Sequence, residues 1–573
     1  MDFEKDTSTG ADIEAPPSLD IETNNPLDEL QPNDLVLPTW RLAFLAISLC
    51  IGLFLSLLDT SIVATALYTI GQDLHSVQTI TWVALAYTLV YLSFCIIIAR
   101  LADIIGRRNA WVLSLTLFLS FSLGCGFSQS LHSLIACRAL QGIGGAGLYS
   151  ITFVIMPEIA PPRIAGYLGG LVGAVVACAG VLGPVLGGLI THYATWRWVF
   201  WINAPIGVIS FALFLIAWPK AHMLAPVQKR PWKDFDFVGS ILVIAASVLV
   251  VFPLQESGVR SNIWNTALFI CPLVLGCICW CLLFGWEFLV SRFWKSQFAS
   301  MFPLRLVKHH IYMAYVIATL LTGFPFFVVI YALPLRFQVV NGKTPLTAGV
   351  GLLPMLGAVA VGSTIGGGVN NKKNNIFPVL VTASCLMTLG TGLMSTLLNT
   401  VNVESKTYGF QVLIGLAFGL TVSTVSLGAG LAADLDDATV GQGIVAQMRV
   451  LGGSIGIAAS TAILGVHQRN ELLRPGIITE EQLATLQTAT RNFSPDQLHA
   501  VRQAYSNAFN EDMRICAVVS GLCILITLGT FRKNTQPIME RRKEQFVIEQ
   551  KRLRELLTRT AGRTARKETT SAA

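Results

Sequence analysis

The chain has 573 residues, of which 53% are hydrophobic and only 13% are charged. Soluble domains carry about 25% charged residues, and a soluble protein of this length could not bury so much apolar surface. The composition therefore excludes a soluble protein and indicates an all-α integral membrane protein with many spans. The formal net charge of +7 comes from loops and the C-terminal segment, so we expect no nucleic-acid-binding module.

Both ends of the chain read as tails outside the membrane. Residues 1–40 hold ten acidic side chains and one lysine, with prolines and no apolar periodicity, which is typical of disorder. They lack the basic start, apolar run and cleavage site of a signal peptide. Residues 532–573 hold twelve Lys or Arg against five Glu. A basic tail of this kind is attracted to anionic lipid headgroups, and its simplest role is to anchor the topology.

Fourteen stretches are long and apolar enough to cross a membrane as helices, which takes about 20 residues each. They are residues 43–66, 80–99, 110–128, 133–156, 166–190, 198–218, 237–255, 266–286, 311–335, 346–368, 376–398, 408–431, 440–466 and 513–531. With both termini inside, the short inner loops hold fourteen Lys or Arg and the short outer loops hold five. Because Lys and Arg favour cytoplasmic loops, we predict two cytoplasmic termini. The cell membrane is the expected location, with a vacuolar or vesicle membrane as the alternative.

Asp59 lies well inside the first span, in the run Leu58–Thr65. A carboxylate in hydrocarbon costs roughly 2.5–3.5 kcal/mol on insertion scales, so it usually faces a protein interior or a water-filled cavity. Arg138, in the fourth span, is predicted at a similar depth. An arginine facing this carboxylate favours its ionised form, and protonation would release the pair. We therefore interpret Asp59 and Arg138 as a proton switch, with a purely structural ion pair as the alternative.

Residues 99–108 join the second and third spans and carry a charge cluster. Asp103 and Arg107 are four residues apart, so on a helical turn they share a face and can pair. Gly106 permits a tight turn, and Arg108 adds a second positive charge. We predict a conformational latch at this end of the helices. The alternative is an ordinary positively charged inner loop.

The fifth span carries a glycine and proline pattern in residues 180–188. Pro184 removes a backbone hydrogen bond and bends a helix. Small residues around it allow close packing or sliding against a neighbouring helix; they are Gly180, Gly183, Gly187 and Gly188. The tryptophans of the following stretch, Trp196–Gly207, belong at a membrane interface.

In this order and on these spans, the three patterns resemble the major facilitator superfamily. The Gly-Pro pattern is the feature linked with antiporters of that family. The runs Asp59–Val63 and Trp196–Gly207 resemble its fourteen-span drug:proton antiporter group, and above all fungal multidrug and toxin efflux pumps. The similarity covers about residues 40–535, although Ala99, Ala64 and Tyr68 depart from the group's usual residues.

The resemblance implies the major facilitator fold, with two six-helix bundles and two inserted helices. The domains then fall at residues 1–40 (acidic tail), 41–218 (first bundle), 219–310 (linker with two extra helices), 311–531 (second bundle, with an outer loop at 467–512) and 532–573 (basic tail). In the family the two bundles rock around a central cavity. The implied function is export of lipophilic small molecules, such as drugs, toxins or secondary metabolites, in exchange for protons.

The predicted substrate cavity is mostly apolar. Asp59 is the only acidic residue well clear of a helix end, and Arg138 and Arg449 are the notable cations. A cavity lined in this way is suited to binding uncharged or lipophilic compounds. Candidate lining residues are Gln141, Phe324, Phe327, Tyr331 and Gln338; for the aromatic ones, a lipid-facing or packing role is the alternative.

Two other functions remain open at this point: proton-coupled transport of basic amino acids or siderophores, and a sensor with a transporter fold. The scarcity of carboxylates counts against a cation carrier. An enzyme is not expected, because the sequence has no P-loop and no nucleophile–base pattern. We expect no cofactor, no metal site and a monomer. The twelve cysteines lie in apolar segments, which indicates buried structural thiols with no disulfide framework. Asn492 begins an acceptor pattern for N-glycosylation.

Overall fold

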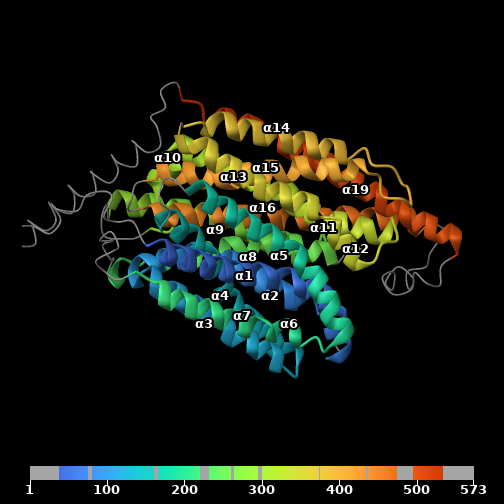
Figure 1. The fold of residues 1–573 in the computed structure, drawn as a ribbon, viewed down its shortest axis with the longest axis horizontal. Helices are drawn as coiled ribbons and strands as arrows, with labels where there is room; N and C mark the ends of the chain where they lie inside the picture. Colours follow the sequence, from blue (N-terminus) through green and yellow to red (C-terminus); the bar gives the residue numbers. More distant parts are fainter. Residues whose placement is uncertain are drawn as a thin grey trace, which may run out of the picture.

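The computed structural model describes residues 38–74, 80–159, 165–219, 231–259, 263–293, 300–372, 374–433, 437–473 and 494–532. The candidate glycosylation site at Asn492 and nearly all of both predicted tails lie outside these residues. The described chain forms long helices that run side by side along the longest axis of the molecule (Figure 1). All twelve cysteines are free, but the prediction that they are buried is wrong for five that lie on the outer faces of apolar helices: Cys178, Cys271, Cys277, Cys281 and Cys385.

The helices of the first part of the chain are α1 (Thr39–Asp73), α2 (Thr81–Ile105), α3 (Arg107–Phe127), α4 (Leu131–Ile159), α5 (Ala165–Tyr193), α6 (Trp198–Trp201) and α7 (Asn203–Ala217). Next come the 3-10 turn η3 (Trp232–Asp234), α8 (Phe237–Val259), α9 (Ala267–Phe293) and α10 (Leu304–Lys308). The last part holds α11 (His310–Val339), α12 (Pro345–Val350), α13 (Leu353–Lys372), α14 (Ile376–Met394), α15 (Lys406–Ala432), α16 (Ala438–His467), the π-helical turn η5 (Gln468–Leu472) and α19 (Pro495–Leu528).

Every predicted span falls on a helix, but the count of fourteen crossings is not confirmed. Within the described residues, twelve helices are long and apolar enough to cross a membrane, and α5 adds a thirteenth if its bent halves count as one. The bend of α5 is 41° between Leu171–Gly180 and Val185–Tyr193. In α19, charged residues continue as far as Arg514. These charges keep α19 out of the twelve, although its 34 residues exceed the about 20 that a crossing needs.

The helices pack in two groups that meet along a shared face. In α1–α7, helix α1 packs against α4, α5 and α7, while α4 also contacts α2 and α3. In α11–α19, helix α11 packs against α16 and α19, and α15 contacts α13 and α14. The groups meet where α5 lies against α13 and where α2 and α4 reach α16. Helix α8 touches both α2 and α16, and α9 packs on α8, so the predicted extra pair lies at the junction of the groups.

We call the end of the bundle at which α1 begins and α19 ends the tail end (Figure 1). Here Gly106 alone separates α2 from α3, with φ at +90°. A side chain is strained in that region, which glycine occupies freely. The tight turn predicted from Gly106 is therefore present, and it points α3 back along α2.

Close packing of α5 on α1 gives the first prediction. A Cβ on Gly183 would collide with Ser61 Oγ and lie 2.9 Å from the backbone nitrogen of Ile62, whereas a Cβ on Gly188 would meet nothing within 4 Å. Overpacking costs typically 1–3 kcal/mol. We expect Gly183→Ala to lower the thermal unfolding temperature in detergent, with Gly188→Ala as the matched control on the same helix. Equal unfolding temperatures for the two variants would contradict this contact.

Candidate functional site

A buried ion pair joins α1 to α4 inside the first helix group. Asp59 is completely buried and Arg138 is 1% exposed. Arg138 Nη1 donates to Asp59 Oδ2, so the two residues predicted at similar depth are in direct contact. Arg138 Nε also donates to the carbonyl oxygen of Val83, at 3.2 Å. The arginine therefore links α1, α2 and α4 through one side chain.

Two amides complete the shell around the carboxylate. Gln141 Nε2 donates to Asp59 Oδ1 at 3.1 Å, and Asn203 Nδ2 donates to the same oxygen at 3.3 Å. Gln141 Oε1 accepts from Arg138 Nη1 at 2.9 Å. Asn203 also donates to Ser122 Oγ at 2.9 Å, which adds α3 and α7 to the network. Hydrogen bonds of this kind are what allow a charge to be buried at all.

Aromatic rings enclose the arginine of the pair. The Arg138 guanidinium carbon lies 4.2 Å from the ring centroid of Tyr87 and 5.7 Å from that of Phe200. Cations are attracted to ring faces, more strongly when both are shielded from water. Tyr87 Oη in turn donates to the carbonyl oxygen of Ser56, at 2.8 Å. The ion pair thus sits in a dry, fully partnered setting rather than on the wall of an open cavity.

The predicted latch is a set of ion pairs at the tail end. Arg107 Nη1 lies 2.8 Å from Asp103 Oδ1, and Arg100 Nη1 lies 3.2 Å from Asp103 Oδ2. The same two arginines reach the other helix group: Arg100 Nη2 lies 3.2 Å from Asp437 Oδ1, and Arg107 Nη2 donates to Thr439 Oγ1 at 2.6 Å. The two helix groups are therefore tied together at this end.

Further contacts anchor these arginines. Arg100 donates from Nε and Nη2 to the carbonyl oxygen of Ser300, at 3.0 and 2.7 Å, and Arg107 Nη2 lies 3.3 Å from Glu158 Oε1. Arg108 is exposed and takes no part in them. Sequence patterns did not indicate that Arg100, Glu158 and Asp437 take part in these ion pairs. The only signal was the acidic stretch that holds Asp437 in an otherwise positive set of inner loops.

The glycine pattern of α5 faces two neighbours. Gly183 lies against α1, as described above, and Ser61 Oγ donates to the carbonyl oxygen of Ala179 at 3.0 Å. A Cβ on Gly180 would lie 3.6 Å from Ile330 of α11, which makes an ordinary contact. Gly187 is buried and Gly188 faces open space. Pro184 lies at the bend of α5.

The candidate cavity residues do not gather in one place. Gln141 is completely buried in the Asp59 network, so it does not line an open surface in this conformation. Phe324, Phe327 and Gln338 of α11 are half-buried, and Tyr331 is 39% exposed. The ring of Phe327 packs on Gly453 of α16.

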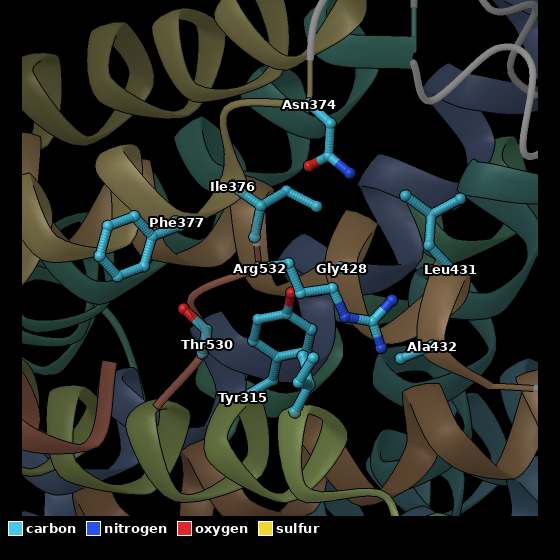
Figure 2. A pocket seen from close by; sticks show the side chains of 10 residues that line it. Tyr315, Asn374, Ile376, Phe377, Gly428, Leu431, Ala432, Thr530 and Arg532 are labelled. Atoms are coloured by element: carbon cyan, nitrogen blue, oxygen red, sulfur yellow. The ribbon is translucent and has the colours of Figure 1, made fainter. Parts of the chain in front are cut away.

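A small pocket lies at the tail end of the second helix group (Figure 2). Tyr315, Phe377, Gly428 and Arg532 are among the residues around it. It contains none of the predicted cavity residues. Arg532 also approaches His309, with 3.4 Å between Nη2 and Nε2, which joins the end of α19 to the start of α11.

Residues 49–457 match the sequence pattern described as the Major Facilitator Superfamily. The chain belongs to the major facilitator superfamily. Among curated members of the superfamily, it is 35% identical over 502 residues to the MFS-type transporter FPY5 of Fusarium mangiferae, covering 85% of this chain and 83% of that protein. It is 28% identical to the rubrofusarin-specific efflux pump aurT of Gibberella zeae (87% and 90% covered) and 28% identical to the efflux pump aflT of Aspergillus parasiticus (85% and 95% covered).

Solved structures support the superfamily fold. The human organic anion transporter MFSD10 superposes with a TM-score of 0.51 at 13% identity, over 84% of this chain and all of that chain. At this identity the likeness shows the fold alone. The family and its relatives make this chain a multi-pass membrane transporter of small molecules, as the sequence predicted.

The buried ion pair gives the second prediction. Removing one partner of a buried pair typically costs 3–5 kcal/mol, because the other charge is left unpaired, whereas replacing both by apolar side chains of similar size is often tolerated. We expect Asp59→Leu and Arg138→Met each to lower the thermal unfolding temperature markedly, and the double variant to recover most of that loss. A double variant as unstable as the sum of the singles would show that the two side chains do not interact.

The latch gives the third prediction. In Asp437→Asn, the ion pair from Arg100 to α16 is lost, so the tail end should open more often. We expect hydrogen exchange of the backbone around residues 100–107 and 437–443 to become severalfold faster, measured by mass spectrometry. Glu404→Gln, which removes the partner of Lys406 in a loop outside the latch, is the matched control. Unchanged exchange in Asp437→Asn would mean that this pair does not hold the tail end closed.

Proposed function

We propose that this transporter exports lipophilic small molecules in exchange for protons, by alternating access between two helix groups. The observation that carries the proposal is the buried Asp59–Arg138 pair. A carboxylate inside a membrane protein marks an ion or proton path by default, and this one has both oxygens bound by donors from other helices. The efflux pumps among its relatives support the direction of transport.

Asp59 would work by losing its charge. Protonation removes the negative partner of Arg138, so the helices α1 and α4 lose the attraction that fixes them. A ligand or proton shifts a two-state equilibrium only by its different affinity for the two states. Asp59 meets this condition if its proton is bound in one state and released in the other. In that scheme the pair is the proton-sensitive contact of the cycle.

The latch and the bend of α5 supply the moving parts of the proposal. Ion pairs from Arg100 and Arg107 hold the groups together at the tail end, which we propose to be cytoplasmic, with fourteen crossings in the cell membrane and both termini inside. The close face of α5 against α1 and α13 would be the surface on which the groups shift. Phe324, Phe327, Tyr331 and Gln338 are proposed to contact the substrate when the groups separate.

The energy available from protons is sufficient for this role. Each proton that enters across 100 mV releases about 2.3 kcal/mol. Since about 1.4 kcal/mol corresponds to a factor of ten in concentration, one proton per cycle can concentrate an uncharged compound roughly 40-fold outside. No nucleotide is required for such a gradient.

The fourth prediction tests proton coupling. Purified protein in liposomes with a pH-sensitive dye inside would be given a pH gradient and a panel of lipophilic aromatic compounds, including rubrofusarin. We expect at least one compound to dissipate the gradient in the wild type, and Asp59→Asn to slow this more than tenfold because its side chain cannot carry the proton. Glu404→Gln is the control for loss of a carboxylate elsewhere. Equal proton flux in wild type and Asp59→Asn would remove Asp59 from the mechanism.

A further inference from the structure

A second arginine is buried between the two helix groups without a carboxylate partner. Arg449 of α16 is 3% exposed. Its Nη1 donates to Tyr149 Oη at 3.3 Å, and its guanidinium carbon lies 4.9 Å from the ring centroid of Phe153. Its Nη2 is buried and has no hydrogen-bond partner. Among the described residues, no acidic side chain pairs with it.

The contrast with Arg138 shows what is missing. Arg138 has Asp59 and several hydrogen bonds, whereas Arg449 has one hydroxyl and one ring. A guanidinium stays charged in proteins, and a buried charge without a partner costs several kcal/mol. Such an unpartnered group in a tightly packed protein needs an explanation. Its planar, forked donors match the two oxygens of a carboxylate, so an anionic group is the partner that this site fits.

The position of Arg449 suits a substrate rather than a structural counter-ion. Tyr149 and Phe153 lie on α4 of the first group, and Arg449 lies on α16 of the second. The backbone of Arg449 also packs against Gly323 of α11. In transporters built from two repeated halves, substrates bind near the middle of the membrane between those halves. Arg449 occupies such a junction.

Aromatic surface lies next to the charge. Arg449 and Gly453 are four residues apart on α16, so they share one face of the helix, and the ring of Phe327 packs on Gly453. Phe153 approaches the guanidinium from α4. A planar lipophilic body could thus rest on these two rings while its acidic group reaches Nη2.

We propose that Arg449 binds the ionised carboxylate of the compounds that this transporter exports. The proposal rests on the proposed export function and names its substrate class: lipophilic aromatic acids. It revises the expectation of uncharged substrates that followed from the mostly apolar spans, because that expectation gave Arg449 no partner.

The fifth prediction compares matched acids and esters. The probes are 2-naphthoic acid and 9-anthracenecarboxylic acid, each with its methyl ester, and binding to purified full-length protein at pH 7 is measured as ligand-induced thermal stabilisation. We expect each acid to bind at least tenfold more tightly than its ester in the wild type. In Arg449→Gln the ratio should fall to about one, mainly through weaker binding of the acid, and Arg449→Lys should keep part of it. Arg305→Gln, a loss of positive charge on exposed α10, is the control.

The proposal is overturned if the acids bind no better than the esters or do not bind, or if Arg449→Gln keeps the preference. A wild-type ratio near one overturns the proposal even if a variant at Arg449 fails to fold. Proton flux measured with the same probes separates the two proposals. Acid binding that depends on Arg449 without proton flux would support this site and contradict antiport, whereas ester-driven proton flux that is unaffected by Arg449→Gln would do the reverse.

Discussion

The requirement that charges be neutralised inside the membrane governs the arrangement of this transporter. Without water, a buried ion must find its partners in the protein. Asp59 does so by drawing Arg138 and Gln141 from α4 and Asn203 from α7. Because both oxygens of the carboxylate accept hydrogen bonds, a change in the charge of Asp59 alters contacts among α1, α4 and α7 at once. The contact that stabilises the first helix group is therefore the one to which we assign proton coupling in the proposed mechanism.

A continuous series of side chains connects this pair to Arg449. Tyr87, which lies against Arg138, stacks on Tyr91 with 5.6 Å between ring centroids, and Tyr91 lies 5.8 Å from Tyr149. Tyr149 then accepts the hydrogen bond from Arg449. Tyr91 Oη is buried without a hydrogen-bond partner. Spatial continuity is not coupling by itself, but it places the proposed proton and substrate groups at the two ends of one packed row.

Sequence patterns predicted the features of the structure that are determined by residues close together in the chain. The apolar stretches located the helices, the depth of Asp59 and Arg138 anticipated their pairing, and Gly106 marked the turn between α2 and α3. Contacts between distant segments could not be read in this way. Arg100 and Asp437 form an ion pair although they are 337 positions apart in the sequence. No local pattern around either residue indicates the other as its partner. Asn203 lies in the tryptophan-rich stretch Trp196–Gly207. Its polar side chain within an apolar span is a sequence signal for a buried hydrogen-bonding partner, here Asp59.

Helix ends and irregularities were also beyond the sequence patterns. Helix α19 begins at Pro495, well before its apolar part, because Ser494 and Gln497 form a capping box there and satisfy free backbone groups. The expected span at 198–218 holds as one crossing, Trp198–Ala217, because Ile202 between α6 and α7 keeps helical backbone angles. Hydropathy reports only where apolar side chains are dense, so it does not detect a polar extension of a helix such as the start of α19.

In the proposed mechanism, the closed tail end lowers the apparent affinity for any substrate that arrives from that side. Arg100 and Arg107 tie the groups together in this conformation, so a compound can reach the junction from there only in the fraction of molecules whose latch is open. The apparent dissociation constant is the intrinsic one divided by that fraction. Each 1.4 kcal/mol by which the latch favours closure therefore weakens apparent affinity about tenfold. Under the proposed function, sequence changes at Asp103, Glu158 or Asp437 would therefore shift the substrate concentration at which export begins, without altering the residues that bind the substrate.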